Sequence, residues 1–216
     1  MISPVSLAIF DFIPSLAFAL GGYYLIQIFG RERPGTPLKL ARIGIILVFA
    51  GGFLKALSKL LYYTSGYQLI IGGVDIMAEQ QFFLLMPGFL LMLLALIKLA
   101  RPSIAAAVAA AAPLGKLPFI AKAPFMVIMS LCAFGVQALL VFLSFKRRQY
   151  IACASFILAF LVLLWMAGMA SGPQTVSREW LEETMNALGQ LSFMAGCYLL
   201  NKRGLTATTA TKAAGS

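Results

Sequence analysis

The chain has 216 residues, of which 61% are hydrophobic and only 11% are charged, and its formal net charge is +10. This balance differs strongly from that of a soluble domain and predicts an all-α integral membrane protein whose main partner is the lipid bilayer. Binding of nucleic acid would need a basic face on a soluble surface. The longest soluble piece, the C-terminal tail, is too short and plain to form one, so we expect no nucleic-acid partner.

Long apolar runs divide the chain into candidate spans, each near the roughly 20 residues that cross a bilayer as a helix. Six runs are clear, and they lie near 4–28, 43–63, 77–97, 123–145, 149–170 and 182–200. A seventh candidate at 102–121 is interrupted by three prolines and by Lys116. Hydropathy alone does not decide whether this segment spans.

Basic clusters decide the number of spans, because loops rich in Lys and Arg stay on the cytoplasmic side. The clusters consist of Arg31, Arg33, Lys39, Arg42, Lys98, Arg101, Lys146, Arg147, Arg148, Lys202 and Arg203. With six spans, the cluster at 146–148 would face the opposite side from the cluster at 98–101. A seventh span at 102–121 returns both to one side. The charges therefore predict a polytopic bundle of seven transmembrane helices, with the N-terminus extracytoplasmic and the C-terminus cytoplasmic.

The first span should remain in the protein, because it lacks the basic start of a cleavable signal and carries Asp11 inside its apolar run. We therefore expect one transmembrane domain over 1–201 and a disordered cytoplasmic tail over 202–216. If the source is bacterial, the expected location is the cytoplasmic (inner) membrane.

A faint internal repeat accompanies this topology, and duplicated three-helix units are common in transport folds. The segment 84–92, LLMPGFLLM, aligns with 192–200, SFMAGCYLL, with Met and Gly in register, and the same offset places Asp75 on Glu183. Ser15 and Ser130 each lie 16 residues before a basic residue at the end of a span. These matches indicate a parallel arrangement of three, one and three spans, and an unrelated seven-helix bundle is the alternative.

Polar residues inside the spans predict a site, since an ionisable group at the bilayer centre costs about 2.5 kcal/mol or more and should face protein or water. In the last span Glu183, Asn186 and Gln190 lie three and four residues apart, which places them on one helical face. In the second span Lys55 and Lys59 share a face by the same spacing. Because a helix rises about 1.5 Å per residue, Lys55 lies roughly 12 Å inside the outer boundary of its span, too deep to reach water easily.

The carboxylates that match these lysines in depth belong to the outer halves of other spans. We therefore predict a charged cavity in the extracytoplasmic half, lined by Asp11, Lys55, Lys59, Glu79, Glu183, Asn186 and Gln190. The alternative is that Lys59 only extends to the lipid headgroups and that the carboxylates of Glu179, Glu182 and Glu183 only solvate a helix start. For Lys55 an inward position is favoured over this alternative, and we predict that at least one carboxylate from Asp11, Glu79 or Glu183 balances its charge.

Catalysis finds little support, because the chain contains no histidine and so lacks the usual base and metal ligand. Cys132, Cys153 and Cys197 lie in three different spans without CxxC spacing, which indicates neither a disulfide framework nor a redox motif. We expect no enzyme activity, no metal and no cofactor.

Two functions fit these observations. The first is a small channel or transporter that admits a polar or charged solute to its outer cavity. The second is a non-transporting subunit, sensor or lipid-binding module of a larger membrane complex, in which the same charges pair internally. A homo-oligomer is compatible with either. Solute flux through the isolated chain in liposomes separates the two.

Overall fold

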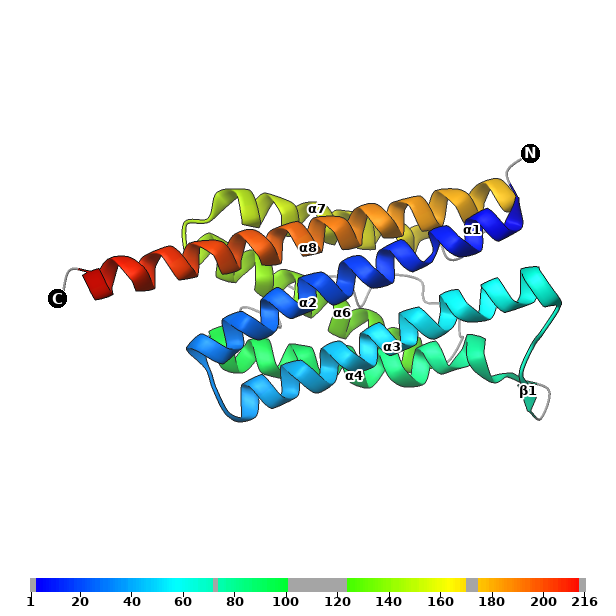
Figure 1. Cartoon of the computed structure of the whole chain (residues 1–216), viewed down its shortest axis with the longest axis horizontal. Helices are drawn as coiled ribbons and strands as arrows, with labels where there is room; N and C mark the ends of the chain where they lie inside the picture. The colour runs from blue at the N-terminus through cyan, green and yellow to red at the C-terminus, as the bar shows by residue number, and fades with distance from the viewer. Residues whose placement is uncertain (1–2, 72–73, 101–123, 170–174, 214–216) are drawn as a thin grey trace.

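The computed structural model describes residues 3–71, 74–100, 124–169 and 175–213, and for 71, 74–82, 124–126 and 203–213 it describes the backbone only (Figure 1). The helices are α1 (Pro4–Phe10), α2 (Phe12–Glu32), α3 (Thr36–Ser65), α4 (Ile76–Ala100), α6 (Pro124–Lys146), α7 (Tyr150–Met169) and α8 (Val176–Ala213). Two short strands, β1 (Ile70–Ile71) and β2 (Val74–Asp75), pair antiparallel between α3 and α4. The expected all-α class is confirmed apart from this small hairpin.

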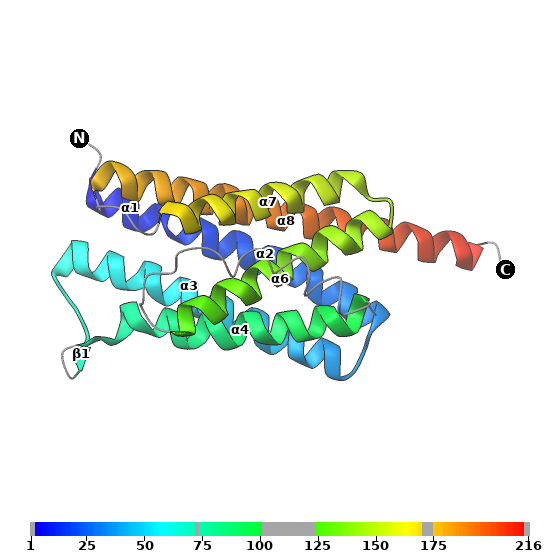
Figure 2. The ribbon, with the colours of Figure 1, turned by 180° about the vertical axis from the view of Figure 1, so that it is seen from behind.

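The long helices lie side by side along the long axis of the molecule. Helices α2, α4, α6 and α8 run in one direction, whereas α3 and α7 run in the other (Figures 1 and 2). Within the described residues, five segments are long and apolar enough to cross a membrane: Pro4–Glu32, Thr36–Ser65, Phe83–Ala100, Val127–Lys146 and Tyr150–Met169. They correspond to five of the predicted spans and support membrane association.

The last predicted span, 182–200, forms part of α8, which is not among those five apolar helices. Its carboxylates and amides lower its hydropathy, but its apolar residues Ala187, Phe193 and Cys197 are buried in the bundle. Helix α8 also continues to Ala213, through most of the tail that was expected to be disordered. The sequence there is rich in Ala and Thr and contains no proline after Leu200, so nothing forces the helix to stop. The candidate span at 102–121 lies outside the described residues.

The centre of the bundle is aromatic and joins helices from both halves of the chain. Phe18 of α2 stacks on Phe193 of α8 with ring centroids 5.3 Å apart. Phe156 of α7 meets Phe193 edge-on at 6.3 Å, and Phe89 of α4 meets Phe18 at 6.4 Å. Such contacts add to the hydrophobic stabilisation of the large buried rings. The four rings form one continuous aromatic layer that joins α2, α4, α7 and α8.

Helices α3 and α4 approach each other most closely at Gly44 and Gly88. A Cβ on Gly44 would lie 2.7 Å from the Gly88 carbonyl oxygen, and a Cβ on Gly88 would lie 2.7 Å from a Val48 methyl group. A side chain at either position would therefore push the helices apart. Small residues of this kind are what close packing of membrane helices requires.

The basic clusters gather at one end of the bundle, where α2, α4 and α6 end and α3 and α7 begin (Figure 1). We call this the basic end; its described basic residues are Arg31, Arg33, Lys39, Arg42, Lys98, Lys146, Arg147, Arg148 and Lys202. The other end, where α1 begins and α3 ends, is called the α1 end. Segregation of the basic residues is thus a property of the fold as well as of the sequence.

Candidate functional site

Asp11 stands at a break in the first span. It is the single residue between α1 and α2, and its N–H donates to the Leu7 carbonyl oxygen at 3.0 Å. Pro14 explains the break, because a proline has no N–H to donate and its ring crowds the carbonyl four residues earlier, at Phe10. Asp11 is only 3% exposed, so the carboxylate at this break points into the protein.

Lys55 and Lys59 reach toward Asp11 from α3. They lie one turn apart on the same face, and their side chains are 33% and 28% exposed. The adjacent contact between α3 and α2 is close, because a Cβ on Gly52 would lie 2.9 Å from the Ser15 hydroxyl oxygen. The missing side chain at Gly52 therefore lets α3 approach the break in the first span.

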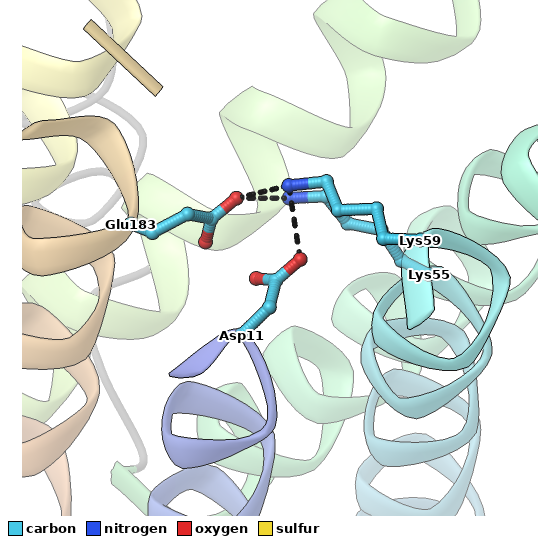
Figure 3. A network of polar contacts seen from close by, with 4 residues as sticks. All are labelled: Asp11, Lys55, Lys59 and Glu183. Carbon is cyan, nitrogen blue, oxygen red and sulfur yellow. Dashed lines mark hydrogen bonds and ion pairs between the residues drawn. The ribbon is translucent and has the colours of Figure 1, made fainter. Parts of the chain in front are cut away.

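Glu183 completes the group from α8, and its side chain is only 6% exposed. Its Oε1 atom lies 2.6 Å from Lys59 Nζ and 3.2 Å from Lys55 Nζ. Lys59 Nζ also lies 3.0 Å from Asp11 Oδ2. Figure 3 shows the two ammonium groups side by side, facing the two carboxylates. We call these four residues the charge cluster.

The charge cluster is balanced, with two ammonium groups and two carboxylates contributed by three parts of the chain. This balance answers the energetic problem of burial, since an isolated charge in a bundle interior is far more costly than a paired one. Two acceptors of the cluster are buried without a hydrogen-bond partner among the described residues: Asp11 Oδ2, whose contact with Lys59 Nζ is an ion pair at 3.0 Å, and Glu183 Oε2. The same holds for the indole N–H of Trp180, one turn earlier on α8. The cluster can thus accept and donate further hydrogen bonds.

The structure brings four of the seven predicted site residues together, and the remaining three differ in their outcome. Asn186 and Gln190 follow Glu183 on α8 as one stripe and are half-buried, deeper in the bundle than the charge cluster. Glu79 lies in α4, and its side chain is outside the described part of the structure. The predicted contact between Lys55 and a carboxylate is confirmed, with Glu183 as the partner.

A second polar network, at the basic end, was not anticipated from the sequence. The Arg31 guanidinium donates to the side-chain and main-chain oxygens of Asn201, and Asn201 Nδ2 donates to Gln27 Oε1 at 2.7 Å. The Arg147 guanidinium pairs with Glu32 at 2.5 Å. Gln27 lies near the end of α2, and Asn201 directly follows the predicted last span within α8; amides in or beside spans commonly hydrogen-bond across helices.

The two networks lie far apart along the same helix pair. Asp11 and Gln27 are 16 residues apart, and Glu183 and Asn201 are 18 apart, which at about 1.5 Å per residue gives roughly 24 to 27 Å. That distance approaches the roughly 30 Å thickness of the hydrocarbon core. Polar contacts therefore connect α2 and α8 near each end of the bundle, with the aromatic layer between them.

Within the described ranges, no group of three or more His, Cys, Asp or Glu side chains is arranged to hold a metal ion. The contacts of the charge cluster are ion pairs and hydrogen bonds. A cationic or hydrogen-bonding solute could compete with a lysine for Glu183, and an anionic solute could compete with a carboxylate for a lysine.

Comparison with known proteins gives no match: the sequence fits no protein-family profile and no curated protein, and it matches no solved structure.

Proposed function

We propose that the protein is a small membrane channel or transporter whose charge cluster lies in the extracytoplasmic half and receives a polar or charged solute. The observation that carries this proposal is the cluster itself: three parts of the chain hold four ionisable groups inside a bundle of apolar helices. Ionisable groups buried within spans are expensive and usually serve a solute or ion pathway. Two of the groups, the lysines, keep about a third of their side-chain surface exposed.

Seven spans with an extracytoplasmic N-terminus belong to this proposal. Helices α4 and α6 run in the same direction, so the end of one and the start of the other lie at opposite ends of the bundle (Figure 2). This arrangement favours an additional crossing between them. The basic end would then face the cytoplasm.

Sidedness has a direct test by labelling with an impermeant maleimide in intact cells. Tyr67 follows α3 at the α1 end and is 51% exposed, which makes it a better site than Gly66, whose φ of +67° disfavours a side chain. Tyr67→Cys should be labelled from outside, whereas Arg33→Cys at the basic end should be labelled only after permeabilisation. The reverse pattern would invert the proposed orientation.

The proposed three-plus-three repeat draws support from two helix contacts. A Cβ on Gly88 would meet Val48 at 2.7 Å, and a Cβ on Gly196 would meet Phe156 at 2.7 Å. Each residue of the second pair lies 108 positions after its counterpart in the first pair, the same offset that aligns 84–92 with 192–200. Helices α3 and α4 thus pack by the same contact as α7 and α8, as parallel repeats would.

The two polar networks suggest how such a protein would work. Both networks connect the first repeat unit (α2, α3 and α4) with the second (α6, α7 and α8). Glu183 of α8 contacts α3 near one end, and Arg147, directly after α6, contacts Glu32 of α2 near the other. We propose that they act as an outer and an inner gate, both closed in this conformation. Opening one network while the other stays paired would expose the interior to one side at a time, which is the basis of alternating access.

A non-transporting role is the second candidate, because the charge cluster is internally neutral and so can stabilise a bundle without any solute. In a non-transporting subunit or sensor of a membrane complex, the same lysines and carboxylates would stay paired permanently. Only a functional measurement separates the two candidates.

The deciding experiment is flux through purified protein in liposomes, measured as swelling in iso-osmotic potassium chloride, lysine hydrochloride, sodium glutamate and glycine. We expect permeation of at least one of these probes, and we expect Glu183→Gln to change it at least tenfold. Glu182→Gln is the matched control, since Glu182 pairs with Arg178 on its own helix and lies outside the charge cluster. No flux for any probe, together with co-purification of a larger complex, would favour the non-transporting role.

A further inference from the structure

An apolar groove lies on the outside of the bundle between α6 and α7, well away from the charge cluster. It is lined by Ala138, Val141, Phe142, Phe145, Ile157 and Phe160 and has a volume of about 390 Å³. That volume lies within the roughly 300–1,000 Å³ of pockets that bind small molecules. The function proposed above makes no use of this groove.

The groove runs along α6 toward the basic end. Its α6 residues lie at successive turns of one face, from Ala138 to Phe145, about 10 Å of helix at 1.5 Å per residue. Phe145 is 63% exposed, and its ring lies 6.3 Å from that of Tyr150 at the start of α7. The next residue after Phe145 is Lys146, so the groove ends at a basic cluster.

The turn that follows α6 presents two uncommitted cations at this end of the groove. Arg147 is occupied by Glu32. Its neighbours Lys146 and Arg148 are exposed, and among the described residues neither has an ion-pair partner within 4.0 Å. Helix α7 begins at Tyr150, so the positive end of its dipole lies beside them. The negative end of the α6 dipole lies at the same turn, so an anion there would be stabilised mainly by the side chains of Lys146 and Arg148.

The backbone of this turn is itself unusual. Arg148 has a φ of +55°, in the left-handed region that residues with a side chain rarely adopt, while the N–H of Gln149 donates to the Ser144 carbonyl at 2.9 Å. Non-glycine residues at such angles cluster at binding sites and switch regions. A glycine would fit this backbone with less strain, yet an arginine is present.

We propose that the groove and the turn together bind one anionic phospholipid, with an acyl chain along the groove and its phosphate between Lys146 and Arg148. The groove faces the hydrocarbon of the membrane, where the available apolar ligand is an acyl chain. Basic pockets between helices at a membrane surface recognise anionic headgroups. The apolar groove matches the acyl chain of such a lipid, and the basic turn at the end of the groove matches its phosphate.

The test is a titration of delipidated protein with phosphatidylglycerol or phosphatidylcholine, read out by native mass spectrometry. We expect wild type to bind phosphatidylglycerol more tightly. Combining Lys146→Gln with Arg148→Gly should weaken that lipid about fivefold for each charge removed and leave phosphatidylcholine unchanged. The glycine also keeps the turn, so loss of binding would not reflect loss of fold. Lys39→Gln with Arg42→Gln is the control, because both are exposed at the basic end but on α3.

A groove-filling variant, Ala138→Phe, tests the acyl half of the proposal and should weaken both lipids without lowering the melting temperature. Equal affinity of wild type for the two lipids would overturn the proposal. So would unchanged lipid binding in Ala138→Phe. A species of twice the chain mass that Ala138→Phe abolishes would assign the groove to a second copy and would also overturn it.

Discussion

The two polar networks connect the same pair of helices, α2 and α8, yet they differ in burial and in charge. At the α1 end, the carboxylates of Asp11 and Glu183 are 3% and 6% exposed and meet two ammonium groups. At the basic end, Asn201 is also buried, at 5% exposed, but it is neutral and hydrogen-bonds Arg31 and Gln27, whereas the Glu32–Arg147 pair is 37% and 25% exposed. Water can replace a lost partner of the Glu32–Arg147 pair but hardly one of Asp11 or Glu183, so these ion pairs should differ several-fold in their effect on stability.

The largest effect should come from Glu183→Gln, which leaves two ammonium groups facing one carboxylate. Removing one partner of a buried pair costs about 3 to 5 kcal/mol, and we expect the lower part of that range because both lysines are partly exposed. The free energy of unfolding in detergent measures this loss. Glu182→Gln should change that free energy by less than about 0.5 kcal/mol. Equal effects of the two substitutions would show that the buried contacts of the charge cluster add nothing to the contribution of Glu183.

Four net-neutral double substitutions should sharpen the comparison, because each removes one lysine and one carboxylate. The combinations Lys55→Met with Glu183→Gln, Lys59→Met with Asp11→Asn, and Lys55→Met with Asp11→Asn each leave a contacting pair, at 3.0, 3.2 and 2.6 Å. Lys59→Met with Glu183→Gln leaves Lys55 and Asp11, which are not among the described pairs within 4.0 Å. This last variant should be the least stable of the four by about 1 to 3 kcal/mol.

The same series separates stability from transport. A double variant that recovers stability but loses solute flux would show that the cluster has a function beyond holding the helices together. If all four double variants have the same melting temperature, the specific contacts in Figure 3 contribute little to stability beyond overall charge balance.

A smaller effect is expected for Asn201→Ala at the basic end. The substitution removes the contacts to Arg31 and Gln27 but buries no uncompensated carboxylate, so a loss of about 1 kcal/mol is expected. Thermal unfolding of purified protein is a suitable measurement. Lys202→Gln, at the neighbouring position, should shift the midpoint less. A loss as large as that of Glu183→Gln would contradict the proposed difference between the ends.

The smallest effect should follow Glu32→Gln. Its pair with Arg147 is open to solvent, and exposed ion pairs contribute about 0 to 1 kcal/mol. The contribution should also decrease as salt is added, which comparison of wild type and variant at low and high ionic strength would reveal. If this substitution changes flux while leaving stability intact, the pair serves as the proposed inner gate.

The sequence was sufficient to predict the helical class, the positions of most spans and the pairing of Lys55 with a carboxylate. Those features follow from hydropathy, helical spacing and depth, all of which are local properties of the chain. Which carboxylate would be chosen was not predictable, since Asp11, Glu79 and Glu183 have similar depths and only the packing of α8 beside α2 decides among them. The contact between Arg31 and Asn201 escaped prediction for the same reason.

The length of α8 shows another limit. Polar residues such as Thr206 and Lys212 favoured a tail without structure. A helix that has already begun nevertheless extends more easily than a new one forms, and no proline stops α8 before Ala213. The close approach at Gly44 and Gly88 was partly visible, because glycine in a span is a sign of helix contact. The sequence did not show, however, which helix would pack against each glycine.

The order in which a ribosome makes the charge cluster has a consequence for insertion into the membrane. Lys59 and Glu183 are 124 residues apart, and Lys55 and Glu183 are 128 apart. Both lysines therefore enter the translocation machinery long before their shared partner has been synthesised, with Asp11 as the one cluster carboxylate already present. In a nascent chain that stops before α8, one of the two lysine ammonium groups has no cluster carboxylate to pair with at membrane depth. Completion of the last helix thus cancels the surplus charge and fixes the first three helices in the same event.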